Sequence, residues 1–219
     1  MKKEVESFDD YWEDACSHLI RQDRILKKII PKFKDAGVIS RGDPFLTLAR
    51  SIVGQQISVA AAQAVWNRFE ASMTKVTPKN VLAMEPQILR EAGLSFRKIE
   101  YVQDLADHFL NKGLAKTKWH TLEDELVIKE LTSIRGIGRW TAEMFLIFNL
   151  KRPDVLPLDD IGLLRAISIN YYSGEKVTRA EAREVAENWA PYRTVATWYL
   201  WRSIDPIPVD YYNLKIHIK

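Results

Sequence analysis

Residues 131–142 read Leu131-Thr132-Ser133-Ile134-Arg135-Gly136-Ile137-Gly138-Arg139-Trp140-Thr141-Ala142, and they lie between two amphipathic segments, 122–134 and 139–150. Two glycines separated by one residue permit a tight turn, so the stretch predicts a hairpin of two helices. The second helix would begin near Arg139 and present unpaired N–H groups and the positive end of its dipole, which suit a phosphate. A simple connector between two helices would show the same glycines, so both interpretations stand.

Helical patterns continue on both sides of this hairpin. Asp43-Pro44 supplies a cap and a first-turn proline, and apolar residues then recur at three- and four-residue steps from Phe45 to Phe69, which predicts one helix of several turns. Further helices are expected after Thr77-Pro78 and Glu85-Pro86, over residues 98–110, from about residue 160, and over a long segment from near residue 178. No sustained alternation of period two appears, so the predicted fold class is all-α.

Composition excludes several classes of protein. The chain has 219 residues, 47% hydrophobic and 28% charged, which is typical of a globular protein and not of a disordered one. Its net charge of +3 is compatible with a nucleic-acid partner without requiring one. Cys16 is the only cysteine, and the four histidines show no HxxxH pair. We therefore expect no disulfide, no iron–sulfur cluster and no zinc site.

The same inspection bears on location. Residues 1–6 become acidic where a secretory signal would need an apolar run, so no such signal is expected. The longest apolar runs, such as Met144–Phe148, are too short to span a bilayer. We therefore expect no membrane partner and a reducing, cytosol-like compartment. The basic run Arg21–Lys34 is either a phosphate-binding face or the solvated face of a helix.

Two consecutive acids follow a proline loop in the segment Leu156-Pro157-Leu158-Asp159-Asp160-Ile161. One of them is expected to cap the helix that begins there. Capping does not need the second acid, and a carboxylate held at that position suits the stabilisation of a developing cation. A structural role for both acids is the alternative.

An aromatic segment, Trp189–Trp201, is expected to be helical near the C-terminus. Trp198 and Trp201 are three residues apart and therefore share a helix face. Such a pair either packs in the core or forms a wall for a flat heteroaromatic ligand. Core packing is the expected role of Trp198, whereas both roles stay open for Trp201.

Taken in this order, the motifs resemble the helix-hairpin-helix DNA glycosylases, specifically the 3-methyladenine DNA glycosylase II branch. The resemblance covers roughly residues 43–202 and includes Asp43–Phe45, Ile52–Ser58, Gly93–Lys98, the hairpin, Pro157–Arg165 and Trp189–Trp201. It implies two helical subdomains with the active-site cleft between them. One would comprise residues 43–150 with the helix-hairpin-helix at about 126–150, and the other residues 1–42 and 151–219.

The resemblance also implies roles for particular residues. Asp160 matches the catalytic aspartate, which leaves Asp159 as the expected cap. Trp140 and Trp201 match aromatic side chains of the base pocket, and Met144 stands in that pocket where relatives place a tyrosine. Gln56 matches the side chain that wedges into the duplex when the target nucleotide leaves it.

The hairpin is implied to hold the DNA backbone. Its carbonyl groups would bind a monovalent cation, Na⁺ or K⁺, that bridges to a phosphate; these are the carbonyls of Thr132, Ile134 and Ile137. The residues expected to contact the DNA backbone are Gly136, Gly138, Arg139, Thr141, Arg97 and Lys98. No cofactor is expected for the chemistry itself.

The implied activity is that of a monofunctional glycosylase that flips alkylated purines such as 3-methyladenine and 7-methylguanine out of double-stranded DNA and hydrolyses their glycosidic bonds in base excision repair. Superfamily members that also cut the strand carry a lysine where this chain has Trp140, so no lyase activity is expected. A monomer is expected, cytoplasmic at the nucleoid in a prokaryote or nuclear in a eukaryote. The alternatives are a glycosylase of the same superfamily for mismatched or oxidised bases, and a non-catalytic DNA-binding module.

Overall fold

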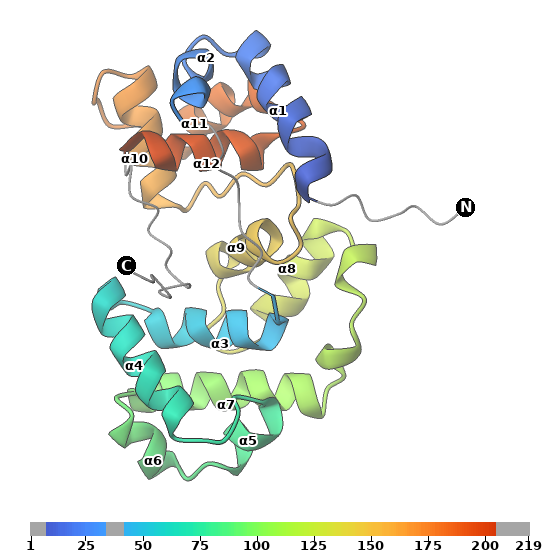
Figure 1. The fold of residues 1–219 in the computed structure, drawn as a ribbon, viewed down its shortest axis with the longest axis vertical. Coiled ribbons are helices and arrows are strands. Elements are labelled where there is room, and N and C mark those ends of the chain that lie inside the picture. Colours follow the sequence, from blue (N-terminus) through green and yellow to red (C-terminus); the bar gives the residue numbers. More distant parts are fainter. Residues whose placement is uncertain (1–7, 34–41, 205–219) are drawn as a thin grey trace, which may run out of the picture. The chain divides into compact units, whose positions relative to one another are not determined.

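The computed structural model describes residues 8–33 and 42–204, and within these ranges the regular elements are all helices (Figure 1). The prediction of an all-α chain is confirmed. The described residues divide into two units, one of residues 8–33 with 146–204 and one of residues 42–145. This division falls within helix α9 (Arg139–Phe148), whereas the boundary expected from the sequence follows residue 150.

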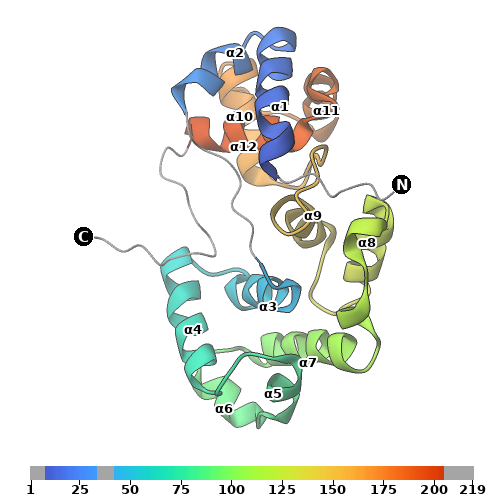
Figure 2. The same ribbon diagram turned by 45° about the vertical axis from the view of Figure 1, so that its right-hand side comes forward.

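The central unit is built around the long helix α7. Its elements are α3 (Pro44–Gly54), α4 (Val59–Ala71), α5 (Pro78–Ala83), α6 (Pro86–Glu91), α7 (Phe96–Leu110), the short 3₁₀ helices η2 (Leu114–Lys116) and η3 (Trp119–Thr121), α8 (Asp124–Thr132) and most of α9 (Arg139–Phe148). Figure 2 shows α3, α5 and α6 packed beside α7. Apolar side chains that recur on one face of α7, from Ile99 to Phe109, are buried there, and Phe109 meets Phe45 of α3 edge to face at 5.4 Å. This packing holds α7, the long helix that precedes the hairpin in the chain.

Several helix starts follow directly from the sequence. The side chains of Asp43, Ser58, Thr77 and Ser95 each accept a hydrogen bond from a backbone N–H in the first turn of the helix that follows. Pro44 and Pro78 occupy first-turn positions, where a missing N–H costs nothing. The expected helices after residues 43, 77 and 85 are present.

The helix predicted to run from Phe45 to Phe69 is wrong, because the structure has two helices there. α3 ends at Gly54, and Ser58 caps α4 by accepting from the N–H of Ala61 at 3.3 Å. Between them, Gln56 has a φ of +57°, a left-handed conformation that no helix interior contains. The apolar spacing runs across this break although it does not mark one buried face, because Ile57, Ala60 and Ala64 are exposed.

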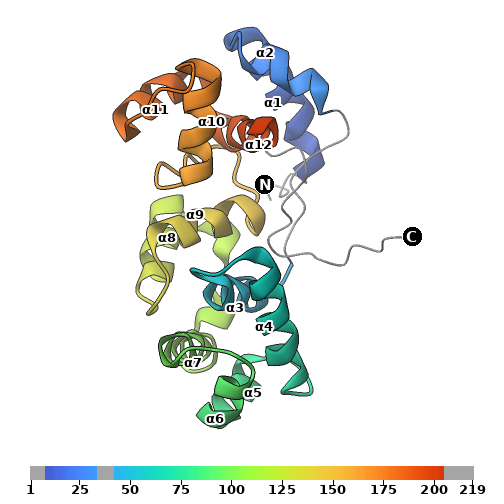
Figure 3. The ribbon, with the colours of Figure 1, turned by 90° about the vertical axis from the view of Figure 1, so that its left-hand side faces the viewer.

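The other unit contains the N-terminal and C-terminal helices. Its elements are α1 (Phe8–Gln22), α2 (Leu26–Ile29), η1 (Ile30–Lys32), α10 (Ile161–Tyr171), α11 (Arg179–Ala186), η4 (Glu187–Trp189) and α12 (Arg193–Ile204). α10 contacts both α11 and α12 (Figure 3). Buried Asp23 accepts hydrogen bonds from the Tyr171 hydroxyl at 2.8 Å and from the Trp189 indole N–H at 3.0 Å. These bonds join the N-terminal segment to the elements around α10.

The segment after residue 178 and the basic run were both singled out in the sequence. The long helix expected from residue 178 is short: Thr178 and Glu181 form a capping box, but α11 ends at Ala186, and Pro191, which has no N–H to donate, separates it from α12. In the basic run, Arg21, Arg24, Lys27, Lys28 and Lys32 are all exposed. Lys34 lies outside the described residues.

Candidate active site

Asp160 lies at the start of α10, where its carboxylate is held by two donors. It has an extended backbone (φ −79°, ψ 113°) and is the N-cap residue of the helix. Its Oδ1 accepts the N–H of Leu163 at 2.6 Å and the indole Nε1–H of Trp201, from α12, at 2.8 Å. The side chain is half-buried. A carboxylate is thus fixed in orientation beside the positive end of a helix dipole.

Trp201 is positioned by its neighbours on both sides. Its ring stacks on Phe148, with centroids 6.2 Å apart and planes inclined by 12°. Close approach is possible because residue 162 is glycine: a Cβ there would lie 3.1 Å from Asp160 Oδ1 and 3.4 Å from Trp201 Cδ1. Trp198, by contrast, is buried and meets Trp12 edge to face at 5.6 Å. The two tryptophans therefore differ, and Trp198 has the core position expected of it.

The expectation that Asp159 caps α10 is wrong. Asp160 directly precedes Ile161, the first residue of the helix, and its carboxylate therefore reaches the N–H of the third helical residue. Asp159 is exposed and pairs with Arg179 of α11 at 2.6 Å instead. One residue thus serves as helix cap and as candidate catalytic group.

The helical hairpin of the central unit is α8, the turn of residues 133–138 and α9. Gly136 has a φ of +84°, and the ring of Tyr101 lies where its Cβ would be, so only glycine fits without strain. Its carbonyl oxygen accepts a hydrogen bond from Gln55 Nε2 at 2.7 Å. Gly138 is exposed, and nothing lies within 4 Å of where its Cβ would be. The turn is therefore held by Gln55 and Tyr101 at Gly136 and is exposed at Gly138.

The expected DNA-contacting side chains of α9 are not equally accessible. Arg139 donates to Glu143 Oε1 at 3.0 Å and forms a two-pronged ion pair with Glu125. The hydrogen bonds that Arg139 donates to Glu125 raise its pKa above the ordinary value. Burial opposes this effect, while the charge of Glu125 and the hydrogen bond and charge of Glu143 add to it. Thr141 is buried. The structure therefore places Arg139 in a carboxylate cluster.

The remaining expected backbone contacts come from the start of α7. Arg97 is exposed, whereas Lys98 is half-buried and its Nζ donates to the carbonyl oxygen of Val53, near the end of α3, at 2.7 Å. Burial lowers the pKa of Lys98. Gln56, the expected wedge, is exposed in the loop after α3. Gln55 and Lys98 thus attach this loop to the hairpin and to α7.

Two of the predicted pocket residues lie on α9. Trp140 is 39% exposed and Met144 only 6% exposed. Both belong to the central unit, whereas Asp160 and Trp201 belong to the other, so the shared base pocket stays a prediction.

The chemistry of the turn fits a monovalent cation, since the carbonyl groups of Thr132, Ile134 and Ile137 are oxygen donors close together in sequence. The Ile134 carbonyl accepts the N–H of Ile137 at 3.1 Å and retains a second lone pair. Among the residues that the structure describes, no group of three or more His, Cys, Asp or Glu side chains is arranged to hold a metal ion. No helix in the described ranges is long and apolar enough to cross a membrane.

Sequence reasoning missed Gln55 and Asp104, which contact the turn, and Glu125, which pairs with Arg139 inside the hairpin. Asp104 Oδ2, on α7, accepts the backbone N–H of Arg135 at 2.8 Å. These partners are distant in sequence, so no local pattern indicates them. Only Gln55, beside Gln56 in the motif, stood next to a residue already singled out.

Comparison with known proteins identifies relatives over most of the chain. The profile of the HhH-GPD superfamily of base excision DNA repair proteins matches residues 49–191. DNA-3-methyladenine glycosylase 1 of Schizosaccharomyces pombe is 34% identical over 183 residues, which are 81% of this chain and 80% of that protein.

Two solved structures are similar in fold and sequence. The Schizosaccharomyces pombe 3-methyladenine DNA glycosylase Mag1, in complex with abasic DNA, matches with a TM-score of 0.77 and 33% identity over 87% of this chain and 96% of that one. The DNA-3-methyladenine glycosidase of Bacillus halodurans matches with a TM-score of 0.79 and 36% identity, over 87% and 89% of the two chains.

Proposed function

The chain belongs to the HhH-GPD superfamily of base excision DNA repair proteins and is a DNA glycosylase of the 3-methyladenine type, and from this premise we propose that it hydrolytically excises alkylated purines from double-stranded DNA. The substrates proposed are 3-methyladenine, 7-methylguanine and similar cationic bases. The observation that carries the proposal is the carboxylate of Asp160, oriented by the Trp201 indole and by the start of α10, inside the matched region.

The chemistry proposed for Asp160 is electrostatic. Alkylation at N3 or N7 of a purine makes the base cationic and therefore a good leaving group. Its departure leaves positive charge on the sugar, as in glycoside hydrolysis. A fixed carboxylate stabilises that charge and orients the attacking water, and it needs no reorganisation because two hydrogen bonds already hold Oδ1. The products are a free base and an abasic site.

The base must first leave the duplex, which costs a few kcal/mol of unstacking and unpairing. We propose that exposed Gln56 fills the space left by the nucleotide and that the hairpin binds the phosphate backbone nearby. Na⁺ or K⁺ held by the turn carbonyls would add positive charge there. The electron-rich faces of Trp140 and Trp201 would attract a cationic base, each by roughly 0.5–2 kcal/mol.

The proposal includes hydrolysis without strand cleavage. Trp140 follows the hairpin turn and has no amine that could form a Schiff base. No iron–sulfur cluster, zinc or other cofactor is required for this chemistry. We further propose that the enzyme acts as a monomer on genomic DNA, at the nucleoid of a prokaryote or in the nucleus of a eukaryote.

Release of free bases from methylated duplex DNA tests this function. Purified protein is incubated with the DNA, and liberated 3-methyladenine and 7-methylguanine are separated chromatographically. Asp160→Asn should nearly abolish release while DNA binding persists. Asparagine keeps an acceptor oxygen for Leu163 and Trp201 and caps helices as well as aspartate does, so the change removes the charge and preserves the local structure.

Asp159→Asn is the matched control, since it neutralises the adjacent acid, which is exposed and paired only with Arg179 among the contacts described. It should retain activity. Full activity of Asp160→Asn would remove that residue from its role. Release of mismatched or oxidised bases, with none from methylated DNA, would contradict the substrate proposed, and a borohydride-trapped protein–DNA adduct would contradict hydrolysis.

A further inference from the structure

The hairpin carries two arginines, Arg135 in the turn and Arg139 at the start of α9, and their environments differ. Arg139 donates to the side chains of both Glu125 and Glu143. Glu143 is only 7% exposed at its side chain, so removing its cation would leave a nearly buried carboxylate without that charge. Arg139 is therefore costly to redirect toward a ligand.

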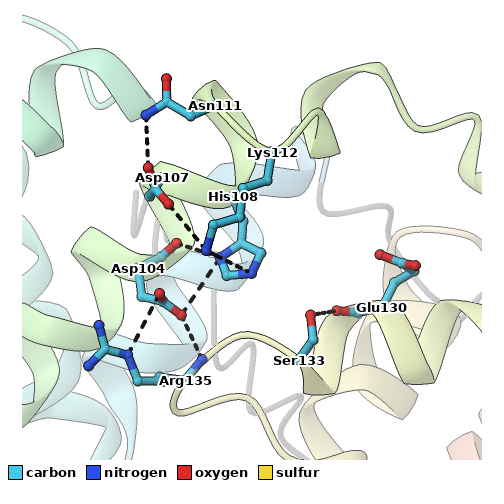
Figure 4. Close-up of polar contacts among 8 residues, drawn as sticks. All are labelled: Asp104, Asp107, His108, Asn111, Lys112, Glu130, Ser133 and Arg135. Carbon is cyan, nitrogen blue, oxygen red and sulfur yellow. Dashed lines mark hydrogen bonds and ion pairs between the residues drawn. The ribbon is translucent and has the colours of Figure 1, made fainter.

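Arg135 is held far more loosely. Its side chain is 64% exposed, and its Nε lies 3.6 Å from Asp104 Oδ1, beyond hydrogen-bond distance (Figure 4). The guanidinium therefore makes no hydrogen bond to Asp104, whose carboxylate keeps the backbone N–H of Arg135 as a partner if the guanidinium turns away. A phosphate offers a guanidinium two parallel charge-assisted hydrogen bonds, which are stronger and better matched to its geometry.

Asp104 contacts both the main chain and the side chain of Arg135, with a different oxygen for each. Its Oδ2 accepts the N–H of Arg135 at 2.8 Å, while Oδ1 faces the guanidinium. The carboxylate is 12% exposed at its side chain and also lies 3.7 Å from His108 Nδ1. When the guanidinium turns away, Asp104 keeps its backbone hydrogen bond, so the turn stays attached to α7.

We propose that Arg135, and not Arg139, is the hairpin arginine that binds a DNA phosphate, and that Asp104 is a positioning residue that keeps the turn fixed while it releases the guanidinium. The inference rests on the proposed function, because it takes the ligand to be DNA. It also reverses the role expected from sequence for Arg139, whose charge is already matched by two carboxylates.

The salt dependence of DNA binding tests the proposal. The probe is a fluorescent duplex with one tetrahydrofuran abasic analogue, titrated with full-length protein between 50 and 200 mM salt. Loss of one phosphate contact should lower the slope of log K against log salt by about 0.9. When the salt concentration rises fourfold, the factor by which DNA affinity falls should therefore be about 3.5 times smaller for Arg135→Gln than for the parent protein. Arg135→Lys, which keeps the charge, should restore most of the slope.

Two matched variants locate the effect. Arg139→Gln should leave the slope unchanged, and Lys79→Gln, which removes an exposed charge on α5, should do the same. A parental slope in Arg135→Gln, or a reduced slope in Arg139→Gln alone, would overturn the proposal. Equal reductions in all three glutamine variants would also overturn it, since net charge would then explain the result. Base release by the parent protein is measured alongside, so failure of the proposed function is recognised separately by its absence.

Discussion

Gly136→Ala should destabilise the protein for two separable reasons. A left-handed backbone costs a residue with a Cβ roughly 1–2 kcal/mol, and Gly136 has a φ of +84°. The new Cβ would also lie 2.8 Å from Tyr101 Cε2 and closer still to Cγ and Cδ2. Overpacking of this kind costs about 1–3 kcal/mol. The free energy of unfolding should therefore fall by about 2–5 kcal/mol in all.

A double-mutant cycle with Tyr101→Ala separates the two contributions. Shortening Tyr101 removes the clash but leaves the strained backbone, so Gly136→Ala in that background should cost only about 1–2 kcal/mol. Gly138→Ala is the control, because its φ is not positive and nothing lies near its Cβ position. Its effect should stay within about 0.5 kcal/mol.

Urea unfolding followed by circular dichroism measures these free energies of unfolding. The steric argument fails if Gly136→Ala costs the same with and without the Tyr101 ring. The conformational argument fails if the alanine is tolerated once that ring is gone. An equal cost at Gly136 and Gly138 would refute both, because it would reflect the loss of glycine and nothing particular to the turn.

Two further changes test the other unit. Trp201→Phe should lower the rate of base release about tenfold, because it removes a hydrogen bond to Asp160 worth about 1.5 kcal/mol. The substitution keeps the aromatic stack on Phe148. An unchanged single-turnover rate would show that the indole N–H does not position the carboxylate. Burial raises the pKa of Asp154, but its hydrogen bonds with Arg193 outweigh burial and hold the pKa below its ordinary value. Asp154→Asn should therefore lower the free energy of unfolding by about 1 kcal/mol above about pH 4. This difference from the parent should vanish as pH falls through the lowered pKa. A difference in stability that is independent of pH in urea titrations would contradict the argument.

Local signals in the sequence were sufficient for much of the fold. Capping residues and first-turn prolines act within one turn of chain, so the helix starts after Asp43, Thr77 and Glu85 were predictable. The break at Gln56 was not, because apolar residues continue at helical spacing across it and the left-handed residue is not a glycine. Periodicity records where apolar residues stand in the sequence, so it is insensitive to a short interruption of the backbone.

Part of the candidate site was likewise predictable from the sequence, and part was not. The resemblance predicts a catalytic role for Asp160, and the structure adds that its Oδ1 accepts from both Leu163 and Trp201. The assignment of the cap to Asp159 failed because adjacent acids at a helix start are indistinguishable by type alone. The expected phosphate contact of Arg139 stays a prediction, and its ion pair with Glu125 is not visible in a local pattern because the two residues lie on different helices.

Asp160 has one oxygen that both caps a helix and accepts from an indole, so the order of α10 and the proposed turnover depend on the same atom. A library randomised at this position would therefore return inactive proteins of two kinds, those that have lost only the charge and those that have also lost helical order. Asparagine isolates the first kind, whereas alanine mixes the two. Selection for activity at position 160 would consequently also select for the integrity of α10.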